Sequence, residues 1–294
     1  MSGRQDEGLA GLLTTVDVCG STNDEAKERA RAGAPSGTAV AARRQTAGRG
    51  RRGHAWATGE GSLCLSVVLR PKVPPSFFVA LPAVTMLGAL SALREATGLG
   101  ARLGIKWPND LVANPDPDAT GRWGTDGRKV AGLLVEAGHG GGGAFAVAGL
   151  GVNVRATATR AARDAAARGG AEVSPQALPP VSLEELLAGS DVALPSLNDL
   201  ARLVHERVVL ACGDWEARLH AVGAGQGPLA CVLPDYRACL PALGSQVAAI
   251  GPAGETIARG LFDDVDAWGR ACVVRGDGSR VSLASEQASL RVLG

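Results

Sequence analysis

Short apolar segments of strand character recur through the first half of the chain, and they limit its fold more than any other feature. Each is five to ten residues long and is bounded by Gly, Pro or polar residues. Runs of this length, rich in Val, Leu and Ile, predict β-strands. We therefore expect strands at Thr38–Ala42, Leu63–Leu69, Leu103–Trp107, Lys129–Glu136 and Phe145–Val154.

Segments with helical spacing lie between and after these strands. Ser21–Ala32 begins with three residues suited to a helix N-cap and ends before a Gly. Phe78–Thr97 carries apolar residues every three or four positions. The same pattern predicts helices at Val181–Leu187 and Ser196–Ala224. The chain therefore combines helices with a sheet.

From about Tyr236 the pattern changes to short strand-like pieces separated by Gly turns. The pieces are SQVAAI, ETIARGLFDDVD, RACVVR and SRVSLAS. Strands at such close spacing predict a small β-barrel at the C-terminus. We expect two domains, residues 1–235 and 236–294.

Composition excludes several classes of protein. The 294 residues include 30 Lys and Arg against 29 Asp and Glu, so bulk attraction to nucleic acid or an anionic membrane is not expected. The N-terminus lacks the pattern of a secretory signal, and we expect no membrane-spanning run. The six Cys and four His show no metal-ligand spacing, so we expect buried free thiols and no metal site. These features favour a cytoplasmic protein.

The stretch QTAGRGRRG, residues 45–53, concentrates the positive charge. Five Arg fall within ten residues, from Arg43 to Arg52. Alternating Gly lets the backbone approach a ligand, and guanidinium forks bind phosphate. The stretch is neither a P-loop nor a dinucleotide-binding GxGxxG motif. Phosphate binding is favoured, while an RGG-like nucleic-acid contact and a solvated loop remain alternatives.

The sequence KWPND, residues 106–110, places a Lys, an amide and a carboxylate around a Pro turn. One interpretation is a pocket rim, with Asn109 and Asp110 orienting other side chains or helping to hold Mg²⁺. The other is an ordinary Pro-Asn-Asp turn.

Four further features each allow two interpretations. Lys129, at the start of an apolar strand, either reaches a buried anion or extends to solvent. The Gly residues of Gly149–Asn153 mark close approach by a ligand or ordinary sheet packing. Ser21–Asn23 forms a helix cap or binds a ureido or carboxylate group. Trp56 covers a purine ring or belongs to the core.

Taken in order, STN, QTAGRGRRG, KWPND, RKVAGLLVE and GLGVN, followed by a small β-domain, resemble the biotin protein ligases. The resemblance runs from about Val16 to Gly294. It implies an α+β fold in which helices flank a mixed sheet, as in class II synthetases, with a C-terminal SH3-like β-domain. It also implies ATP-dependent biotinylation of a Lys on the biotin carboxyl carrier domain of acyl-CoA carboxylases. The expected route passes through biotinyl-5′-AMP and releases pyrophosphate, with Mg²⁺ required and no tightly bound prosthetic group.

The resemblance also assigns roles to individual residues. It implies that Lys129 and Arg51 are catalytic. The implied biotin contacts are Ser21, Thr22, Asn23, Gln45, Gly48, Arg49, Gly50, Arg51 and Lys129. The implied ATP and adenylate contacts are Arg49, Arg51, Arg52, Trp56, Lys106, Asn109, Asp110 and Asn153.

The chain also departs from parts of the family. Only about 20 residues precede Ser21, fewer than the winged helix of members that double as repressors, so we expect no DNA binding. Separately, we expect a monomer or weak homodimer. Asn114–Gly127 and Arg155–Pro180 look like insertions, the second being mobile or locally helical. The rival hypotheses are a lipoate–protein ligase, a nucleic-acid-binding module and a catalytically idle biotin sensor.

Overall fold

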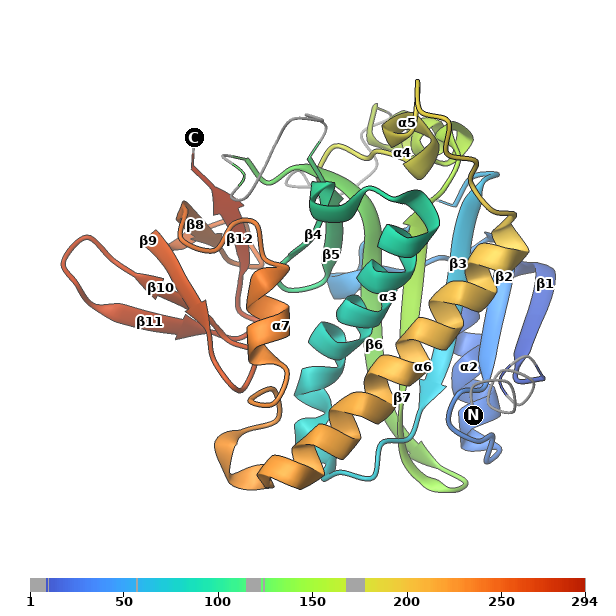
Figure 1. Ribbon diagram of the computed structural model, residues 1–294, viewed down its shortest axis with the longest axis horizontal. Coiled ribbons are helices and arrows are strands. Elements are labelled where there is room, and N and C mark those ends of the chain that lie inside the picture. Colours follow the sequence, from blue (N-terminus) through green and yellow to red (C-terminus); the bar gives the residue numbers. More distant parts are fainter. Residues whose placement is uncertain are drawn as a thin grey trace.

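A seven-stranded mixed sheet forms the centre of the molecule (Figure 1). The computed structural model describes residues 9, 11–56, 58–114, 123, 125–167 and 178–293. In the sheet, β1 and β2 are parallel and every other neighbouring pair is antiparallel. In spatial order the strands are β1 (Leu13–Cys19), β2 (Ala39–Gln45), β3 (Ser62–Leu69), β7 (Gly143–Asn153), β6 (Arg128–Gly140), β5 (Asp110–Ala113) and β4 (Leu103–Lys106).

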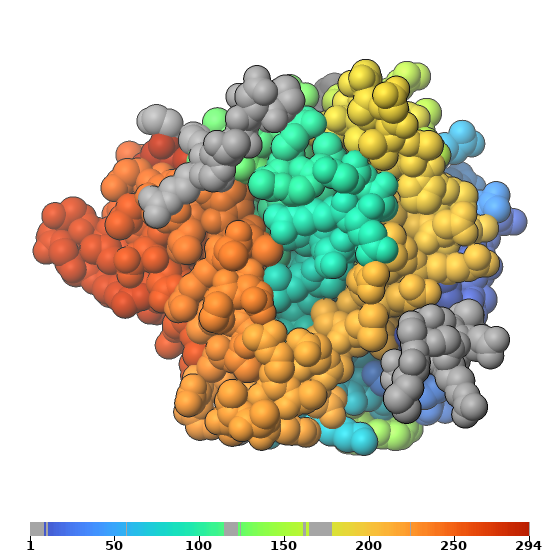
Figure 2. Space-filling view, viewed as in Figure 1, coloured from blue at the N-terminus to red at the C-terminus, as the bar shows by residue number. Residues whose placement is uncertain are grey.

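Two long helices, α3 (Leu81–Thr97) and α6 (Leu197–Val222), cover one face of this sheet (Figure 1). Their apolar side chains share a large buried core with alternate residues of the strands, such as Leu65 and Leu150. Figure 2 views the molecule from this side, where α3 and α6 form much of the visible surface. This face is therefore filled by apolar packing, which includes the buried Trp215 of α6.

The helix α2 (Thr22–Arg31) lies against the opposite face of the sheet. It contributes Ala26 and Ala30 to a second, smaller cluster that contains Val68 and Phe145. Small side chains on α2 bring its backbone close to the strands, and its N-terminus lies beside β3 and β7.

The C-terminal part contains a five-stranded antiparallel sheet in the order β11-β10-β9-β8-β12. Its side chains, including Phe262 and Leu290, continue the large core. The predicted domain boundary at 235/236 falls inside α7 (Leu233–Ala238), and the division into two domains stays a prediction. The strands are β8 (Gln246–Ile250), β9 (Thr256–Val265), β10 (Ala271–Val274), β11 (Arg280–Leu283) and β12 (Ser289–Val292).

The remaining described elements are short. The α-helices are α4 (Ala156–Ala167) and α5 (Leu183–Leu186). The 3₁₀ turns are η1 (Arg51–Gly53), η2 (Pro75–Ala80), η3 (Gly100–Arg102) and η4 (Ala224–Gln226). The α4 helix agrees with the locally helical interpretation of Arg155–Pro180, whose residues 168–177 lie outside the described part. Residues 115–122 and 124 of the other predicted insertion, Asn114–Gly127, also lie outside the described part.

The expected α+β fold is confirmed, as are the five strands predicted before residue 155 and the helices α2, α3, α5 and α6. The sequence analysis missed β1, β5, α7 and β12. The strand β1 is an edge strand whose exposed residues weaken its pattern, and β5 has four residues directly after a turn.

The expectation that no apolar run is long enough to span a membrane was wrong by length and composition alone, and the expectation that the Cys are buried held for three of the six. The segment Pro75–Thr97 is long and apolar enough to cross a membrane, but 72 % of its most apolar window is buried inside the protein, where η2 and α3 pack in the core. Of the six free Cys, three are buried, and Cys19, Cys231 and Cys239 are partly exposed.

Candidate active site

A buried polar cluster joins the N-terminus of α2 to the sheet. The Gln45 side-chain oxygen accepts hydrogen bonds from the Thr22 backbone amide at 2.7 Å and the Thr22 hydroxyl at 3.0 Å. The Ser66 hydroxyl lies 2.8 Å from Thr22 Oγ1 and 2.6 Å from Asn23 Oδ1. Ser21 stands at the N-cap, buried, and its side chain makes no cap hydrogen bond to the described residues. The structure therefore gathers the four predicted residues Ser21, Thr22, Asn23 and Gln45.

Ser66 is a member of this cluster that the sequence analysis missed. It is fully buried in β3, a strand in which every residue is buried. Its signal was a single hydroxyl within the apolar run LCLSVVL, where a buried polar group needs a hydrogen-bond partner. That partner lies on α2, far away in sequence.

Glu136 is a second member that the sequence analysis did not single out. It accepts hydrogen bonds from Asn23 Nδ2 at 2.8 Å and from Lys27 Nζ at 2.8 Å. Burial alone would raise the pKa of Glu136, but the hydrogen bonds from Lys27 and Asn23 outweigh burial and lower it. The carboxylate therefore stays charged and fixes the Asn23 amide.

Gly149 explains how Asn23 fits against the sheet. A Cβ atom at Gly149 would lie 1.9 Å from Asn23 Oδ1. Gly149 pairs with Ser66 across β3 and β7, and both residues lie against the Asn23 amide. The first glycine of GLGVN thus gives room to a side chain of this protein.

The Gly/Arg stretch forms a hairpin-like loop above these strands. Backbone hydrogen bonds join Trp56 N to Gly48 O at 2.9 Å and Gly50 N to His54 O at 2.7 Å. Arg49, on one limb, donates two hydrogen bonds to the Asp24 carboxylate at 2.7 and 2.6 Å. This bidentate pair lowers the pKa of Asp24.

Arg51 points to a different part of the site. It donates to Asn109 Oδ1 at 3.0 Å and to the carbonyl oxygen of Ser285 in the C-terminal part. Burial lowers the pKa of Arg51, as does the neighbouring charge of Arg52. Arg52 adopts a positive φ of 57° and donates to the Glu286 carbonyl at 3.2 Å. The loop thus contacts both sheets of the protein.

Lys129 forms an ion pair with Asp110, the residue that follows Asn109. Its ammonium lies 2.7 Å from Asp110 Oδ1 and 5.4 Å from the centre of the Trp56 ring. Asn153 donates to the Lys129 carbonyl oxygen at 3.2 Å. Two adjacent residues of the KWPND turn therefore each hold one cation, Asn109 the guanidinium of Arg51 and Asp110 the ammonium of Lys129.

The Trp56 ring lies against two glycines on neighbouring strands. A Cβ atom would lie 2.3 Å from Trp56 Cε2 at Gly151, and 3.1 Å from Trp56 Cζ3 at Gly132. Gly132 and Gly151 pair across β6 and β7, so together they form a floor for the indole. The room predicted for a ligand over these glycines is therefore taken by the Trp56 ring of the protein itself.

Lys106, like Arg51 and Arg52, contacts the C-terminal part of the chain. Its side chain is buried and donates to the Leu290 carbonyl oxygen at 2.6 Å. Asp126 lies 4.0 Å from the Lys106 ammonium and 3.4 Å from Arg291. Burial lowers the pKa of Lys106, and the Asp126 charge opposes that shift.

Comparison with known proteins gives a consistent assignment. Residues 16–153 match the model of the Biotin/lipoate A/B protein ligase family. Biotin--[acetyl-CoA-carboxylase] ligase from Paracoccus denitrificans is 35 % identical over 261 residues, which cover 88 % of this chain and 92 % of that protein. The protein of the same name from Mycobacterium tuberculosis is 33 % identical over 284 residues, covering 95 % and 89 %. The chain belongs to the biotin protein ligase family.

A solved structure supports the same fold. Biotin protein ligase from Aquifex aeolicus, in complex with biotin and ATP, superposes with a TM-score of 0.68 at 23 % identity, covering 96 % of this chain and 99 % of that one. The prediction that the chain is an enzyme that ligates biotin is confirmed by its relatives. The roles of individual residues remain predictions.

The described residues of this ligase do not form a ready magnesium site of their own. The Asp110 carboxylate faces Lys129, and the Asn109 oxygen faces Arg51. Within the described part, no group of three His, Cys, Asp or Glu side chains could hold a metal ion. Both candidate oxygens already have cationic partners, so they fit poorly as ligands of a resident ion.

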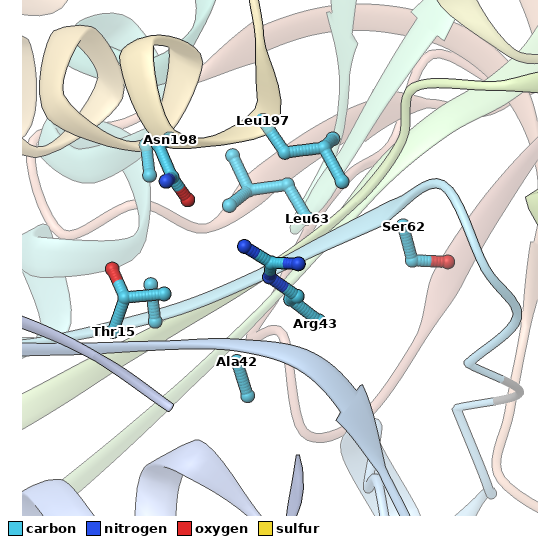
Figure 3. Close-up of a pocket in the computed structure, with 9 residues that line it drawn as sticks. Thr15, Ala42, Arg43, Ser62, Leu63, Leu197 and Asn198 are labelled. Carbon is cyan, nitrogen blue, oxygen red and sulfur yellow. The ribbon is translucent and has the colours of Figure 1, made fainter. Parts of the chain in front are cut away.

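A small cavity elsewhere in this ligase is unrelated to these residues. It lies on the α6 side of the sheet and is lined by residues of β1, β2, β3 and the start of α6 (Figure 3). Its lining includes Thr15, Arg43, Leu63 and Asn198, and none of the predicted site residues. The cavity therefore lies apart from the predicted site residues.

Proposed function

We propose that this ligase activates biotin with ATP and then transfers it to a Lys of a biotin carboxyl carrier domain. In the first step a biotin carboxylate oxygen attacks the α-phosphorus of ATP. The bond between the α-phosphorus and the bridging oxygen breaks, which gives biotinyl-5′-AMP and pyrophosphate. In the second step a Lys amine attacks the biotinyl carbonyl carbon, AMP leaves, and the amine loses a proton.

One observation carries this proposal. Lys129 and Arg51 are held by Asp110 and Asn109, adjacent residues of one turn, and Lys129 lies beside Trp56, whose backbone bonds to Gly48 in the loop that follows Gln45. The first step brings two anions together, so it needs fixed positive charge where they meet. The proposed catalytic cations are Lys129 and Arg51, with Lys129 at the carboxylate–phosphate junction.

The neighbouring residues are proposed to bind the two halves of the intermediate. Ser21, Thr22, Asn23 and Gln45 offer hydroxyl and amide groups suited to the ureido ring of biotin. Trp56 offers an aromatic surface for the adenine, and Asn153 and Lys106 line the same pocket. Mg²⁺ is proposed to enter with the phosphates of ATP, since Asp110 and Asn109 are already paired with cations.

The Gly/Arg loop is proposed to shield the intermediate from water. A mixed anhydride hydrolyses readily, so the adenylate must be retained until a carrier arrives. The loop contacts α2 through Arg49 and the C-terminal part through Arg51 and Arg52. It is therefore placed to cover both ends of the pocket.

The test is transfer of label in a defined mixture. The chain is incubated with ATP, Mg²⁺, labelled biotin and a biotin carboxyl carrier domain, with labelled lipoate and a lipoyl domain in parallel. We expect label on the carrier and pyrophosphate in the first mixture alone. Label from lipoate instead would favour the lipoate ligase alternative. Bound biotin without pyrophosphate would favour a sensor, and no biotin binding at all would contradict the proposal.

Three further predictions belong to this proposal. The ligase is expected in the cytoplasm, where free thiols stay reduced. A monomer or weak homodimer is expected in solution, which sedimentation measures directly. No DNA partner is expected, and a gel-shift experiment with duplex DNA checks this.

A further inference from the structure

The two arginines Arg49 and Arg51 of the Gly/Arg loop are held in chemically different ways. Arg49 pairs with the Asp24 carboxylate through two hydrogen bonds, at 2.7 and 2.6 Å. Arg51 instead donates to uncharged oxygens, those of the Asn109 amide and the Ser285 carbonyl. The charge of Arg49 is thus matched within the protein, while the charge of Arg51 remains available to an anion.

Arg49 belongs to a ring of alternating charges. Lys27 lies 3.0 Å from Asp24 and 2.8 Å from Glu136. Arg49 lies 2.6 Å from Asp24 and 4.0 Å from Glu136. Two cations therefore share two carboxylates, one carboxylate on α2 and one on β6. An exposed ion pair alone contributes little, but bidentate geometry within such a network strengthens it.

This ring of charges contacts the Gly/Arg loop on the limb that carries Arg49 and faces α2. The base of the loop is attached to the sheet by Thr46 N, which donates to Cys19 O at 3.0 Å, and by Ala47 N, which donates to Gly20 O at 2.9 Å. Beyond that base, the Arg49 side chain ties the loop to the helix that carries Thr22 and Asn23. Arg49 also pairs with Ala55 across the loop, so both limbs are fixed together.

We propose that Asp24 is a positioning residue, which anchors the Gly/Arg loop over the biotin pocket through Arg49, with Glu136 as a supporting carboxylate. The role of the anchor in biotin retention rests on the proposed function. The anchoring itself does not, because it concerns the chain without ligand. Asp24 touches neither substrate nor reacting atoms in this scheme. It sets how long the loop stays closed.

The first test is digestion of the unliganded chain with trypsin, measuring cleavage after Arg51 and Arg52 by mass spectrometry. We expect Asp24→Asn to be cut there about fivefold faster than the parent, the loss expected for one charged pair in a network. The matched control is Asp17→Asn, because Asp17 forms an exposed ion pair with Arg43 at 3.5 Å outside the loop. The control should be cut at the parent's rate.

A second variant separates anchoring from damage to α2. Arg49→Gln breaks the same pair without altering the first turn of the helix, so it should speed loop cleavage as Asp24→Asn does. If Asp24 acts through Arg49, Asp24→Asn adds no further change in the Arg49→Gln background. An equal, additional acceleration in that background would overturn the proposal. So would unchanged cleavage in Asp24→Asn itself.

The third test measures biotin kinetics. We expect Asp24→Asn to raise the KM for biotin about fivefold while kcat changes little, because anchoring favours the closed loop rather than the reacting atoms. Asp24→Glu should restore part of the loss. A fall in kcat with unchanged KM would overturn the positioning role. Absence of biotin transfer by the parent chain would contradict the proposed function and leave the cleavage comparison standing.

Discussion

The two faces of the seven-stranded sheet follow different rules, and neighbouring residues of β3 show the contrast. Leu65 points into the large apolar core shared with α3 and α6. Ser66 points to the opposite face, where it meets Thr22 and Asn23 of α2. Both residues are completely buried. On the α2 face, burial around Ser66 therefore serves hydrogen bonding, beside the small apolar cluster that contains Val68.

This contrast shows what each face demands from its residues. The core face needs apolar side chains whose summed volume fills the space, and many combinations of Leu, Val and Ala provide that volume. The site face needs particular partners, since a buried hydroxyl or amide without one costs free energy. It also needs glycines such as Gly149 and Gly151, because side chains of α2 and of the loop lie directly on the strands. The predictions below test this division.

The largest effect is expected at Lys129, on the site face. Lys129→Ala should lower adenylate formation by roughly 100- to 1000-fold, as for loss of one preorganised charge at a transition state. The fold should persist, because Lys129 lies at the edge of the packed region and pairs with Asp110 alone among the described carboxylates. Pyrophosphate release measures the effect, with exposed Lys72→Ala as control. Unchanged release would remove Lys129 from the mechanism.

The next largest effects are expected for substitutions of Leu65 and Ser66, the two neighbouring residues of β3. Leu65→Ala should lower the free energy of unfolding by about 3 kcal/mol through a core cavity. Activity of the folded enzyme should change little. Ser66→Ala should cost about 1 kcal/mol of stability and weaken biotin binding. Denaturant titration and biotin binding measure both. Equal weakening of biotin binding by the two variants would break the division between the faces.

A smaller effect is expected from adding one carbon to the site face. In Gly149→Ala the new Cβ would meet Asn23 Oδ1, so the amide must leave its position. Biotin affinity should fall about tenfold if a buried hydrogen bond to Asn23 is lost. The control is Gly213→Ala in α6, where a Cβ meets nothing within 4 Å and helix propensity improves. Calorimetry of biotin binding distinguishes the two variants.

The smallest effect is a pH dependence from Glu136. Its pKa is lowered in the folded protein, so its contribution to stability is present above its ordinary pKa. That contribution is lost as pH falls through the folded value. Glu136→Gln should therefore melt below the parent near pH 7, and the difference in Tm should shrink below about pH 4. A difference that grows on acidification would contradict the ion-pair ring.

Much of the fold could be predicted because its patterns are local. The helix α6 was expected from its apolar stripe, and β6 and β7 from their apolar runs. The elements that were missed lack such a signal. Within the described sheet the strand β1 pairs only with β2, and a four-residue strand such as β5 depends on its neighbours in the sheet. Pairing partners distant in sequence decide these elements.

The candidate site was predicted as a set of residues, but not as a set of contacts. The order of motifs led to Arg49, Arg51 and Lys129, and the structure places Arg51 and Lys129 against adjacent residues of one turn and Arg49 against α2. Nothing local revealed that Arg49 would pair with Asp24 and Arg51 with Asn109. Glu136 was visible only as the last residue of an apolar strand.

The amino-acid sequence by itself determined the family, the main helices and strands, and the concentration of positive charge near residue 50. These depend on residue types and spacing within short segments. Only the tertiary structure decided which arginine is neutralised within the protein and which side chains lie over Gly149 and Gly151. The physical reason is that ion pairs and close contacts depend on distances between segments far apart in the chain, which spacing along the sequence does not specify.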